Sequence, residues 1–546
     1  MKNYFNTKII LLLIVLFAGF LRFYQISVTA PALNWDEAAL GYNAYSIGVD
    51  GRDEFGKFLP FKYLESYGDY KPVVYSYLAV IPIKLFGLNE FGVRFPSALL
   101  GTLTVLLTYL LIKEIFPKKE KDLRIEFIAL TSAFFLAISP WHIMLSRGAY
   151  EANVSTFFII LGIYLFLKAI NRNMWILILS AISFTISFYT FNTARVFVPL
   201  LGLTLLIGFR KELWKNKKQT VLAGLVSLVI LLPTIPFLLS PQAKLRFAEV
   251  NIFSDPKIVV TSNQYAQNDK NVVWSKAIHN RRVLFGLTFA EHYLDNLNPS
   301  FLFINGDGNP RFATGDVGQM YLFDIPFFIA GIFLLFRRRE GYYWLIPVWL
   351  LLGIIPAATA RETPHALRIE TVLPTFQIIT AYGFVCLIFM LKKYRGLVAG
   401  ILLTLLLLNF AYFYHGLLTH YSREFSSEWQ YPYKALVKFV DENGGKYTKI
   451  NITEGLGRPY IYFLVYDKYD PAKFRQTSRI EREALGFVHI RGFDKYSFIE
   501  NMGQEDKVQK GILYVVTPSQ VPTNVRVLKR FYTIDGKEEL IAYEAN

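Results

Sequence analysis

The residues best placed to do chemistry are two adjacent carboxylates, Asp36 and Glu37, in the segment Asn34-Trp35-Asp36-Glu37. They stand a short distance after the first apolar run, so they should lie near a bilayer surface. A carboxylate pair held there is suited to accepting a proton or handling ions. The same residues also fit a helix start, with Asn34 as the N-cap and Glu37 returning a hydrogen bond to it. The two interpretations are compatible, because a cap fixes both carboxylates on a rigid element.

Composition places these acids in a membrane protein. The chain has 546 residues, of which 53% are hydrophobic and 16% aromatic, and its mean hydropathy is +0.32. Soluble domains rarely reach such values, so we predict a polytopic α-helical membrane protein. The net charge of +16 comes from short basic clusters between apolar runs, which is typical of membrane anchors and argues against a nucleic-acid partner. The single cysteine, Cys386, excludes an intrachain disulfide and a cysteine-based metal site.

The apolar segments predict about eleven transmembrane helices, the first of them retained rather than cleaved as a signal peptide. They are residues 8–24, 95–113, 126–145, 152–170, 174–190, 194–210, 219–239, 320–336, 342–360, 371–391 and 396–415. Every second loop holds a basic cluster: Lys118-Lys119 with Arg124, Arg172, Arg210–Lys218, Arg337–Arg339, and Lys392-Lys393 with Arg395. Because positive charge favours the cytoplasmic side, we expect a multi-pass protein of the plasma (inner) membrane, with a cytoplasmic N-terminus and an extracytoplasmic C-terminus.

One further apolar stretch, Val73–Phe86, is short and contains Pro82 and Lys84. Counting it as a span would place the basic clusters outside, so we predict an interfacial helix within a long external loop, 25–94. The expected parts are a membrane module (1–240), an external loop (241–319), further transmembrane helices (320–415) and an extracytoplasmic α/β domain (416–546).

The last of these parts has a mixed pattern. It predicts a helix over Tyr431–Asp441, strands over Lys449–Thr453 and Gly511–Thr517, and a hairpin of Val525–Ile534 with Glu538–Tyr543. No internal repeat relates the two halves of the chain, which weighs against an inverted-repeat transporter.

Four cations fall near membrane boundaries on the predicted external side: Lys71, Arg94, Arg147 and Arg368. Each alone fits a side chain that reaches from a helix end to the lipid headgroups. Together they need more explanation, because positive charge should be depleted on that side. Other polar residues accompany them, and we take these as candidate substrate contacts: Asp69, Tyr70, Glu151 and His365.

A lipid-phosphate substrate explains the four cations. A departing phosphate at the membrane surface is stabilised by two or three cations, and a hydroxyl nucleophile needs a carboxylate to accept its proton. Asp36 or Glu37 would supply the base. Lys71, Arg94, Arg147 and Arg368 would hold the phosphate on the opposite side of the reacting carbon.

The order of these motifs resembles that in glycosyltransferase family 39 and its relatives, which include protein O-mannosyltransferases and the lipid A aminoarabinose transferase, all of the GT-C fold. The resemblance covers about residues 1–240. Its motifs are the acid pair, Lys71-Pro72, Arg-Phe-Pro-Ser-Ala-Leu-Leu-Gly at 94–101, and Ser146-Arg147-Gly148-Ala149. The stretch 306–311 also looks like a bacterial member of this group.

The resemblance implies an inverting transfer of a sugar from a polyprenyl-phosphate donor to a hydroxyl or phosphate of a lipid, glycan or protein acceptor at the outer face of the membrane. By motif, Asp36 matches the catalytic carboxylate, Glu37 its partner, and Lys71 the cation near the donor phosphate. The sequence departs from the family pattern at Val73, where many relatives have a second proline. The acid that follows the Arg147 motif is displaced to Glu151, which puts its functional role in doubt.

No cofactor is expected to be required, and a divalent metal remains an open alternative that the sequence does not support. The run from Gly306 to Arg311 contains Asp307 and Asn309, but the glycines there fit turns better than a cation site, and we expect a loop that covers the donor sugar. The histidines 279, 292 and 365 do not have the spacing of a zinc site.

Two alternatives to an enzyme remain open from the sequence. The first is a transporter or flippase of lipid-linked sugar, which would use the same cations without chemistry. The second is a non-catalytic envelope scaffold, for which the acid pair would be dispensable and the residues from about 420 essential.

Overall fold

The computed structural model of the chain describes residues 6–117, 123–240, 243, 250–391, 393–483, 488–500 and 508–546. Its internal contacts separate two units. The membrane unit comprises Met1–Arg22, Ser97–Ser146 and Glu151–Phe413, and the acid-pair unit comprises Phe23–Pro96, Arg147–Tyr150 and Tyr414–Asn546. This grouping differs from the four consecutive parts expected from the sequence, because residues 23–96 and 414–546 belong to one unit.

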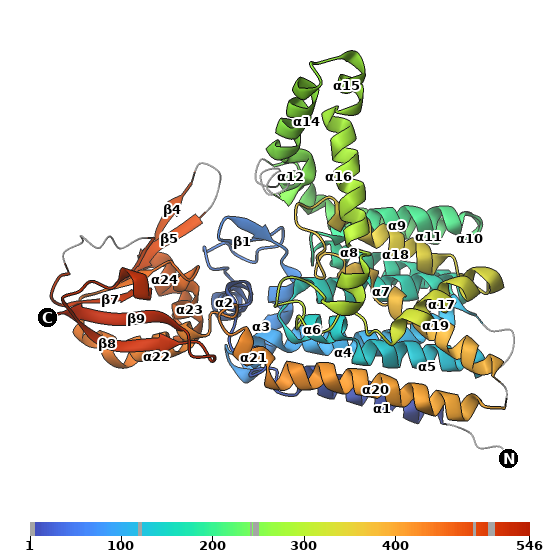
Figure 1. Ribbon diagram of the computed structural model, residues 1–546, viewed down its shortest axis with the longest axis horizontal. Coiled ribbons are helices and arrows are strands. Elements are labelled where there is room, and N and C mark those ends of the chain that lie inside the picture. The colour runs from blue at the N-terminus through green and yellow to red at the C-terminus, as the bar shows by residue number, and fades with distance from the viewer. Residues whose placement is uncertain are drawn as a thin grey trace. The chain divides into compact units, whose positions relative to one another are not determined.

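The membrane unit is helical (Figure 1). Its helices are α1 (Thr7–Phe23), α4 (Glu90–Ile115), α5 (Leu123–Ile138), α6 (Pro140–Arg147), α7 (Glu151–Asn171), α8 (Leu177–Phe188), α9 (Ala194–Gly208), α10 (Arg210–Lys215), α11 (Lys217–Leu231), α12 (Ile235–Leu238), α14 (Pro256–Asn268), α15 (Val273–Ile278), α16 (Arg281–Asp295), α17 (Asp324–Arg338), α18 (Leu345–Ala358), α19 (Thr375–Met390) and α20 (Arg395–Thr419). The ends of α1, α4, α6 and α20 extend into the acid-pair unit.

Every apolar segment predicted to span is helical over most of its length, and the protein is a multi-pass membrane protein. Among the described residues, five helices are long and apolar enough to cross a bilayer: α4, α7, α11 continued by α12, α19 with its preceding turn, and α20. The broken pair α5–α6 adds a sixth if it counts as one span. The expected number of about eleven therefore stays a prediction. The predicted basic-cluster residues Lys118, Lys119 and Lys392 lie outside the described residues.

A buried arginine stabilises the break between α5 and α6, where the chain bends by 56°. Pro140 has no N–H to donate to the carbonyl of Leu136, and the N–H of Trp141 bonds to Gln319 instead of to Ala137. The Arg22 guanidinium, fully buried, donates to the carbonyls of Leu136 at 3.3 Å and Ala137 at 3.1 Å and contacts His142 Nδ1 at 2.7 Å. The Leu136 carbonyl also accepts the N–H of Ser139 at 3.4 Å.

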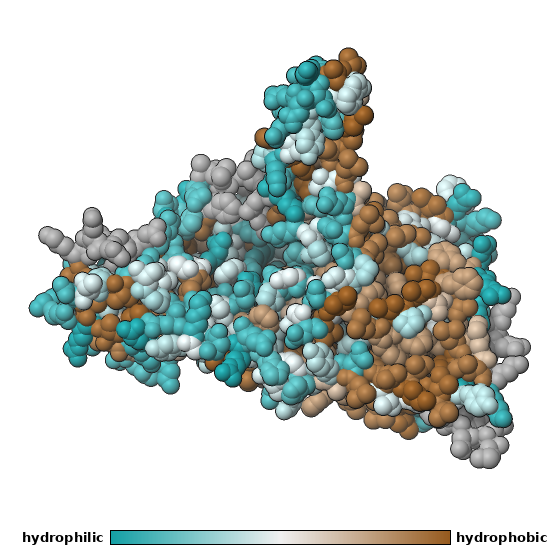
Figure 2. Space-filling view, in the orientation of Figure 1, coloured by the Kyte–Doolittle hydropathy of each residue, from teal (hydrophilic) through white to brown (hydrophobic). Residues whose placement is uncertain are grey.

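The side of the membrane unit seen in Figure 2 is largely brown, that is, apolar. Exposed leucine, isoleucine and valine side chains of α9 and α11 contribute to the unit's apolar surface, among them Leu203, Ile207, Leu225 and Val229. In water such a surface would be unstable, whereas lipid chains cover it at no cost, so it fits contact with the hydrocarbon of a bilayer.

The acid-pair unit joins a short α/β segment to a seven-stranded sheet. Its N-terminal part contains α2 (Trp35–Asp50), the hairpin β1 (Leu64–Ser66) and β2 (Asp69–Lys71), and α3 (Val74–Phe86). The interfacial helix predicted at 73–86 is thus confirmed as a helix. It packs on α2, with Ile47, Leu64 and Val73 forming a small apolar cluster.

The C-terminal sheet has the strand order β4-β5-β6-β3-β7-β9-β8. Its elements are α21 (Tyr421–Glu424), α22 (Pro432–Asn443), β3 (Lys449–Thr453), α23 (Pro459–Tyr466), α24 (Pro471–Thr477), β4 (Arg479–Arg482), β5 (Val488–Phe493), β6 (Tyr496–Ile499), β7 (Ile512–Val516), β8 (Val525–Tyr532) and β9 (Glu538–Ala545). The α/β class, the helix near 431–441, both predicted strands and the terminal hairpin are confirmed. The strand β3 pairs in parallel with β6 on one side and β7 on the other. The chain therefore leaves β3 at a switch point of the sheet, the usual position of a ligand crevice in open α/β sheets.

Candidate active site

The acid pair begins helix α2 in the way its sequence predicts. Asn34 is the N-cap, and its side-chain oxygen accepts the backbone N–H groups of Asp36 at 2.9 Å and Glu37 at 3.0 Å. Glu37 Oε2 accepts the N–H of Asn34 at 3.2 Å and completes a capping box. Both carboxylates are consequently attached to the first turn of a rigid helix.

Glu37 is fully buried and committed to protein contacts. Its Oε1 accepts bonds from Arg94 Nε and from the N–H of Ala149, and its Oε2 accepts bonds from Arg94 Nη2 and the N–H of Asn34. A carboxylate with two acceptor bonds on each oxygen has no free lone pair for a substrate proton. Its geometry fits a positioning role beside Asp36.

Arg94 is the buried partner of Glu37 and uses all five of its N–H groups on protein acceptors. Besides the two bonds to Glu37, it donates to the carbonyls of Ile26 at 2.8 Å, Ala30 at 2.7 Å and Ala32 at 2.5 Å. Its guanidinium also lies over the Trp429 ring, 5.2 Å from the centroid. Arg94 thus fastens the chain entering α2. Because all five N–H groups of Arg94 already bond to protein, none is left for the phosphate of the sugar donor, the contact that the sequence had predicted for this residue.

Asp36 differs from Glu37 in exposure and in partner. Its side chain is 49% exposed and forms an ion pair with Lys71, whose side chain is only 10% exposed. Lys71 ends β2, where it pairs with Leu64 of β1. Its ammonium lies 5.8 Å from the centroid of the Tyr67 ring. The structure therefore brings together a solvent-accessible carboxylate and a largely buried cation from distant parts of the predicted loop.

The segment around Arg147 belongs to the same unit. The N–H of Ala149 bonds to Glu37 Oε1 at 2.8 Å, so this turn is tied to the acid pair. Arg147 is buried and donates to the carbonyl of Tyr24 at 2.8 Å. Asp36, Lys71 and Arg147 therefore come from segments that converge on the start of α2.

Asp69 and Tyr70 lie on the hairpin that presents Lys71. Asp69 accepts the N–H of Tyr70 at 2.8 Å, and the Tyr70 ring packs edge-on against Tyr63 at 4.9 Å. Because side chains alternate along a strand, Asp69 shares the face of Lys71 and Tyr70 points to the other. Asp69 is thus the better placed of the two substrate candidates.

Three predicted site residues belong to the membrane unit: Glu151, His365 and Arg368. Glu151 is the first residue of α7. Arg368 donates to the backbone carbonyl of Glu362 at 2.9 Å and pairs with its carboxylate at 3.3 Å. The His365 ring packs at a tilt against Phe312, with the centroids 5.1 Å apart, and burial, with Arg368 nearby, lowers the pKa of His365 to about 3, so it is neutral at pH 7. Their part in substrate binding stays a prediction.

The loop containing Asp307 has a structural task within the membrane unit. Asp307 accepts the N–H of Asn309 at 2.8 Å and that of Ala366 at 2.6 Å, and its carboxylate is 3.9 Å from His365 Nδ1. The carboxylate therefore links this loop to the segment 364–368. That this loop covers the donor sugar stays a prediction.

Among the described residues, one group of side chains has metal-ligand geometry: Glu454, His489 and Glu500. Arg491 already neutralises it, at 3.5 Å from Glu454 and 2.8 Å from Glu500, while His489 contacts Glu483 at 2.6 Å. The group is thus better described as an ion-pair network than as a cation site.

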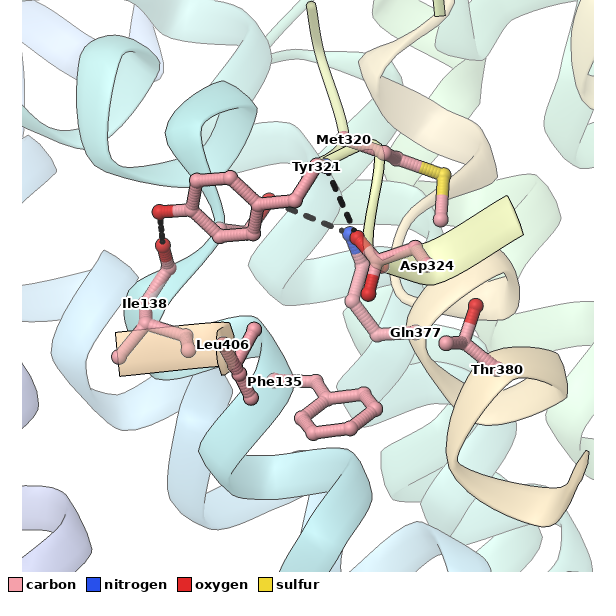
Figure 3. A pocket seen from close by; sticks show the side chains of 9 residues that line it. Phe135, Ile138, Met320, Tyr321, Asp324, Gln377, Thr380 and Leu406 are labelled. Atoms are coloured by element: carbon pink, nitrogen blue, oxygen red, sulfur yellow. Dashed lines mark hydrogen bonds between the residues drawn. The ribbon is translucent and has the colours of Figure 1, made fainter. Parts of the chain in front are cut away.

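A cavity inside the membrane unit is lined by residues of α5, α19, α20 and the start of α17 (Figure 3). Asp324, Gln377 and Thr380 line it with Phe135 and Leu406. The volume open to the centre of a water molecule is about 10 Å³. This cavity can hold one water molecule and is far too small for a sugar.

The site contains contacts that the sequence did not reveal. The hydroxyl of Tyr67 donates to the carbonyl of Trp35 at 2.7 Å, and the guanidinium of Arg458 stacks on the Tyr67 ring, 3.9 Å from its centroid. Arg458 is separated from the acid pair by some four hundred residues of chain, so no local pattern could have associated it with Asp36.

Comparisons with known proteins agree with this architecture. The family model described as dolichyl-phosphate-mannose-protein mannosyltransferase matches residues 70–237. An uncharacterized protein of Aquifex aeolicus (strain VF5) is 32% identical over 189 residues, which are 33% of this chain and 36% of that protein. The chain thus matches about a third of the length of that relative.

Two solved structures share the fold. ArnT from Cupriavidus metallidurans bound to undecaprenyl phosphate superposes with a TM-score of 0.53 at 11% identity, over 98% of this chain and 97% of that one. The oligosaccharyltransferase of Archaeoglobus fulgidus gives 0.51 at 16% identity, over 85% of this chain and 64% of that one. The resemblance predicted from the motifs is therefore confirmed, and the chain has the fold of the GT-C membrane glycosyltransferases.

Proposed function

We propose that the protein is an inverting glycosyltransferase that moves a sugar from a polyprenyl-phosphate donor to an acceptor hydroxyl or phosphate at the outer face of the membrane. The observation that carries the proposal is the half-exposed Asp36 carboxylate paired with the nearly buried Lys71 on a capped helix. Support comes from the mannosyltransferase family match, which includes Lys71, Arg94 and Arg147, and from the shared fold.

In the proposed reaction the acceptor oxygen attacks the anomeric carbon while the bond from that carbon to the phosphate oxygen breaks. Asp36 takes the acceptor proton, and the electron pair of the broken bond leaves with the phosphate. The products are a glycoside of inverted configuration and a polyprenyl phosphate. Lys71 and Arg147 are the cations we assign to the departing phosphate.

Glu37 and Arg94 hold this machinery in place. Their buried ion pair connects α2, α4 and the turn at Ala149, so the two residues position Asp36 and Arg147 without contacting substrate. The adjacent acids thus have separate tasks, one exposed and chemical and the other buried and structural.

The proposal includes a setting and a range of acceptors. The donor is a polyprenyl-phosphate-linked hexose or pentose, and the acceptor is a lipid, a glycan or a protein. The protein lies in the plasma membrane with the acid-pair unit on the extracytoplasmic side, and it needs no metal cofactor.

The test is to incubate the purified full chain with a panel of labelled polyprenyl-phosphate sugars and a membrane extract as acceptor. We expect labelled product of inverted anomeric configuration from at least one donor. A lipid-sugar transporter would instead move labelled lipid across a proteoliposome bilayer and form no glycoside, a result that would refute the proposed enzyme.

A further inference from the structure

The C-terminal sheet contributes a cation to the acid pair's surroundings. The connection between β3 and α23, residues 454–458, leaves the sheet at its switch point, where β6 and β7 flank β3 in parallel. Ligands of open α/β sheets bind at this kind of position. The connection therefore has the topological place of a ligand loop, although its sheet is not the part of the chain that matched the family model.

A glycine holds this loop against the acid pair. Gly457 has φ +109°, and a β-carbon built on it would lie 2.9 Å from the Trp35 ring, nearer than real β-carbons approach another atom. Trp35 immediately precedes Asp36, so the loop packs on the first turn of α2. Both the backbone conformation and the close contact need the absence of a side chain.

The next residue, Arg458, places its guanidinium over Tyr67, 3.9 Å from the ring centroid. Lys71 lies 5.8 Å from the same centroid, so two cations surround one aromatic ring. Arg458 is half-buried, and among the residues that the structure describes it makes no hydrogen bond or ion pair, so no protein acceptor there engages its five N–H groups.

Three acids lie near Tyr67 and Arg458. Asp36 pairs with Lys71, and Glu454, on the same connection as Arg458, pairs with Arg491 at 3.5 Å. Glu54 is buried, and burial raises its pKa to about 8, so it is mostly protonated at pH 7. A half-buried guanidinium that stacks on an aromatic ring presents a planar fork of donors that suits a phosphate or a carboxylate.

We propose that Arg458 binds an anionic group of a substrate, a phosphate or a carboxylate, next to Asp36. This inference rests on the proposed function. The anion has two possible sources, the donor phosphate or an acidic acceptor, and both would be recognised by the same planar fork of donors.

The experiment compares Arg458→Gln with Arg526→Gln in the purified full chain. Arg526 is an exposed sheet arginine paired with Glu544, so it controls for loss of a guanidinium. The two measurements are the Kd for undecaprenyl phosphate and the acceptor-extract concentration that gives half-maximal transfer. Apparent Tm values establish folding, and Arg458→Lys, which keeps the charge, is expected to recover part of the loss.

If the bound anion is the donor phosphate, Arg458→Gln should raise the Kd for undecaprenyl phosphate about tenfold or more. If the bound anion belongs to the acceptor, the Kd for undecaprenyl phosphate should stay unchanged, and the acceptor-extract concentration that gives half-maximal transfer should rise about tenfold. If both quantities match those of Arg526→Gln, the proposal for Arg458 is overturned. Failure of the proposed function is a separate outcome: the wild-type protein would then bind undecaprenyl phosphate without transferring sugar. In that case, an unchanged Kd for undecaprenyl phosphate in Arg458→Gln would still exclude a contact between Arg458 and the lipid phosphate.

A second inference comes from the helical arm of the membrane unit, α14 to α16, which projects from the bundle (Figure 1). Val283, Leu287 and Leu294 repeat with the spacing of one helix face along α16, and all three are exposed. At the tip, Val273 is 87% exposed beside the exposed Trp274. Figure 2 shows the apolar atoms of the arm along its right-hand edge, the side on which the bundle presents its apolar surface.

We infer that this arm lies on the membrane, with the α16 stripe and the α15 tip in contact with lipid. Lipid is the expected contact because the arm continues the lipid-facing surface of the bundle. The Tyr293 hydroxyl of α16 donates to the carbonyl of Leu351, a half-exposed residue of α18, and so joins the arm to that surface. Basic residues flank the tip, which suits anionic headgroups: Lys270, Lys276, Arg281 and Arg282.

Site-directed spin labels test the arm in nanodiscs of zwitterionic and anionic phospholipid. Labels are introduced through Val273→Cys or Leu287→Cys in a Cys386→Ala background, with Gln264→Cys on the polar side of α14 as control. We expect labels at 273 and 287 to collide with oxygen in preference to a water-soluble nickel chelate, and the label at 264 to do the reverse. Equal access of the chelate to all three labels would overturn the lipid contact.

Discussion

At the scale of single residues, two neighbouring acids have different environments. Asp36 is half exposed and has a cationic partner, whereas Glu37 is enclosed by four donors. The sequence predicted the pair and its cap, and the family resemblance made Asp36 the catalytic carboxylate and Glu37 its partner, but the pattern did not show how the two environments differ. Those depend on Arg94 and Ala149, which come to Glu37 from other segments of the chain.

The buried ion pair predicts a stability effect for Glu37→Gln. Removing one charge leaves Arg94 buried without its counter-ion, which typically costs about 3–5 kcal/mol. We expect a much lower apparent Tm in detergent, measured by intrinsic fluorescence during heating. Asp36→Asn is the matched control, because its half-exposed side chain should change the Tm little; equal Tm values for the two variants would contradict the structural role of Glu37.

Lys71→Ala should lower turnover and donor affinity together, because a cation on a leaving phosphate acts in the ground and transition states alike. We expect a loss of about 10²-fold in turnover, measured with the labelled donor. Lys71→Arg need not restore it, since an ammonium and a planar guanidinium present their donors differently. Lys57→Ala, which removes a loop lysine stacked on Tyr63, is the control; a loss of protein yield alone would make Lys71 an ordinary interfacial anchor.

Glu54 predicts a pH dependence of stability. Burial raises its pKa from 4.5 to about 8, even though Tyr460 and Asn43 donate hydrogen bonds to it. The folded state therefore holds a proton that the unfolded state loses, and stability falls as pH rises from about 4.5 to about 8, by at most about 1.4 kcal/mol per pH unit. Apparent Tm values across this range should show the decline, and Glu54→Gln should flatten it. An unchanged slope in the variant would exclude Glu54 as its source.

At the scale of elements, the contact of the β3–α23 connection with α2 depends on Gly457. A side chain there would meet Trp35 and force an unfavourable backbone conformation, at a cost of about 1–3 kcal/mol. We expect Gly457→Ala to lower sugar transfer clearly, whereas Gly445→Ala, with open space around it, should transfer at the wild-type rate. Equal transfer rates would show that the loop tolerates displacement from α2.

The elements themselves were largely predictable. Helical periodicity and apolar length identified the membrane helices, and alternation with an Asp535-Gly536 turn identified the terminal hairpin. The broken helix at Pro140 was not predicted, because the Arg22 contacts that stabilise it come from α1. Helix length also left the number of spans open, since several apolar helices are shorter than a bilayer requires.

At the scale of the whole molecule, the sequence predicted an extracytoplasmic α/β domain over residues 416–546, and the structure groups residues 414–546 with residues 23–96 and 147–150 in the acid-pair unit. Trp429 lies under Arg94, and Gly457 lies against Trp35. Deleting the chain from about residue 420 would therefore remove support for the acids themselves. Such a deletion cannot distinguish an enzyme from a scaffold, so point variants at the site are needed.

The most direct measurement of the central claim is sugar transfer by purified Asp36→Asn, with undecaprenyl-phosphate binding measured on the same preparation. Removing a general base predicts a loss of about 10²–10⁴-fold in turnover with the Kd for the lipid nearly unchanged, because the amide keeps the shape of the side chain and loses only its basicity. Transfer by this variant at the wild-type rate would contradict the account.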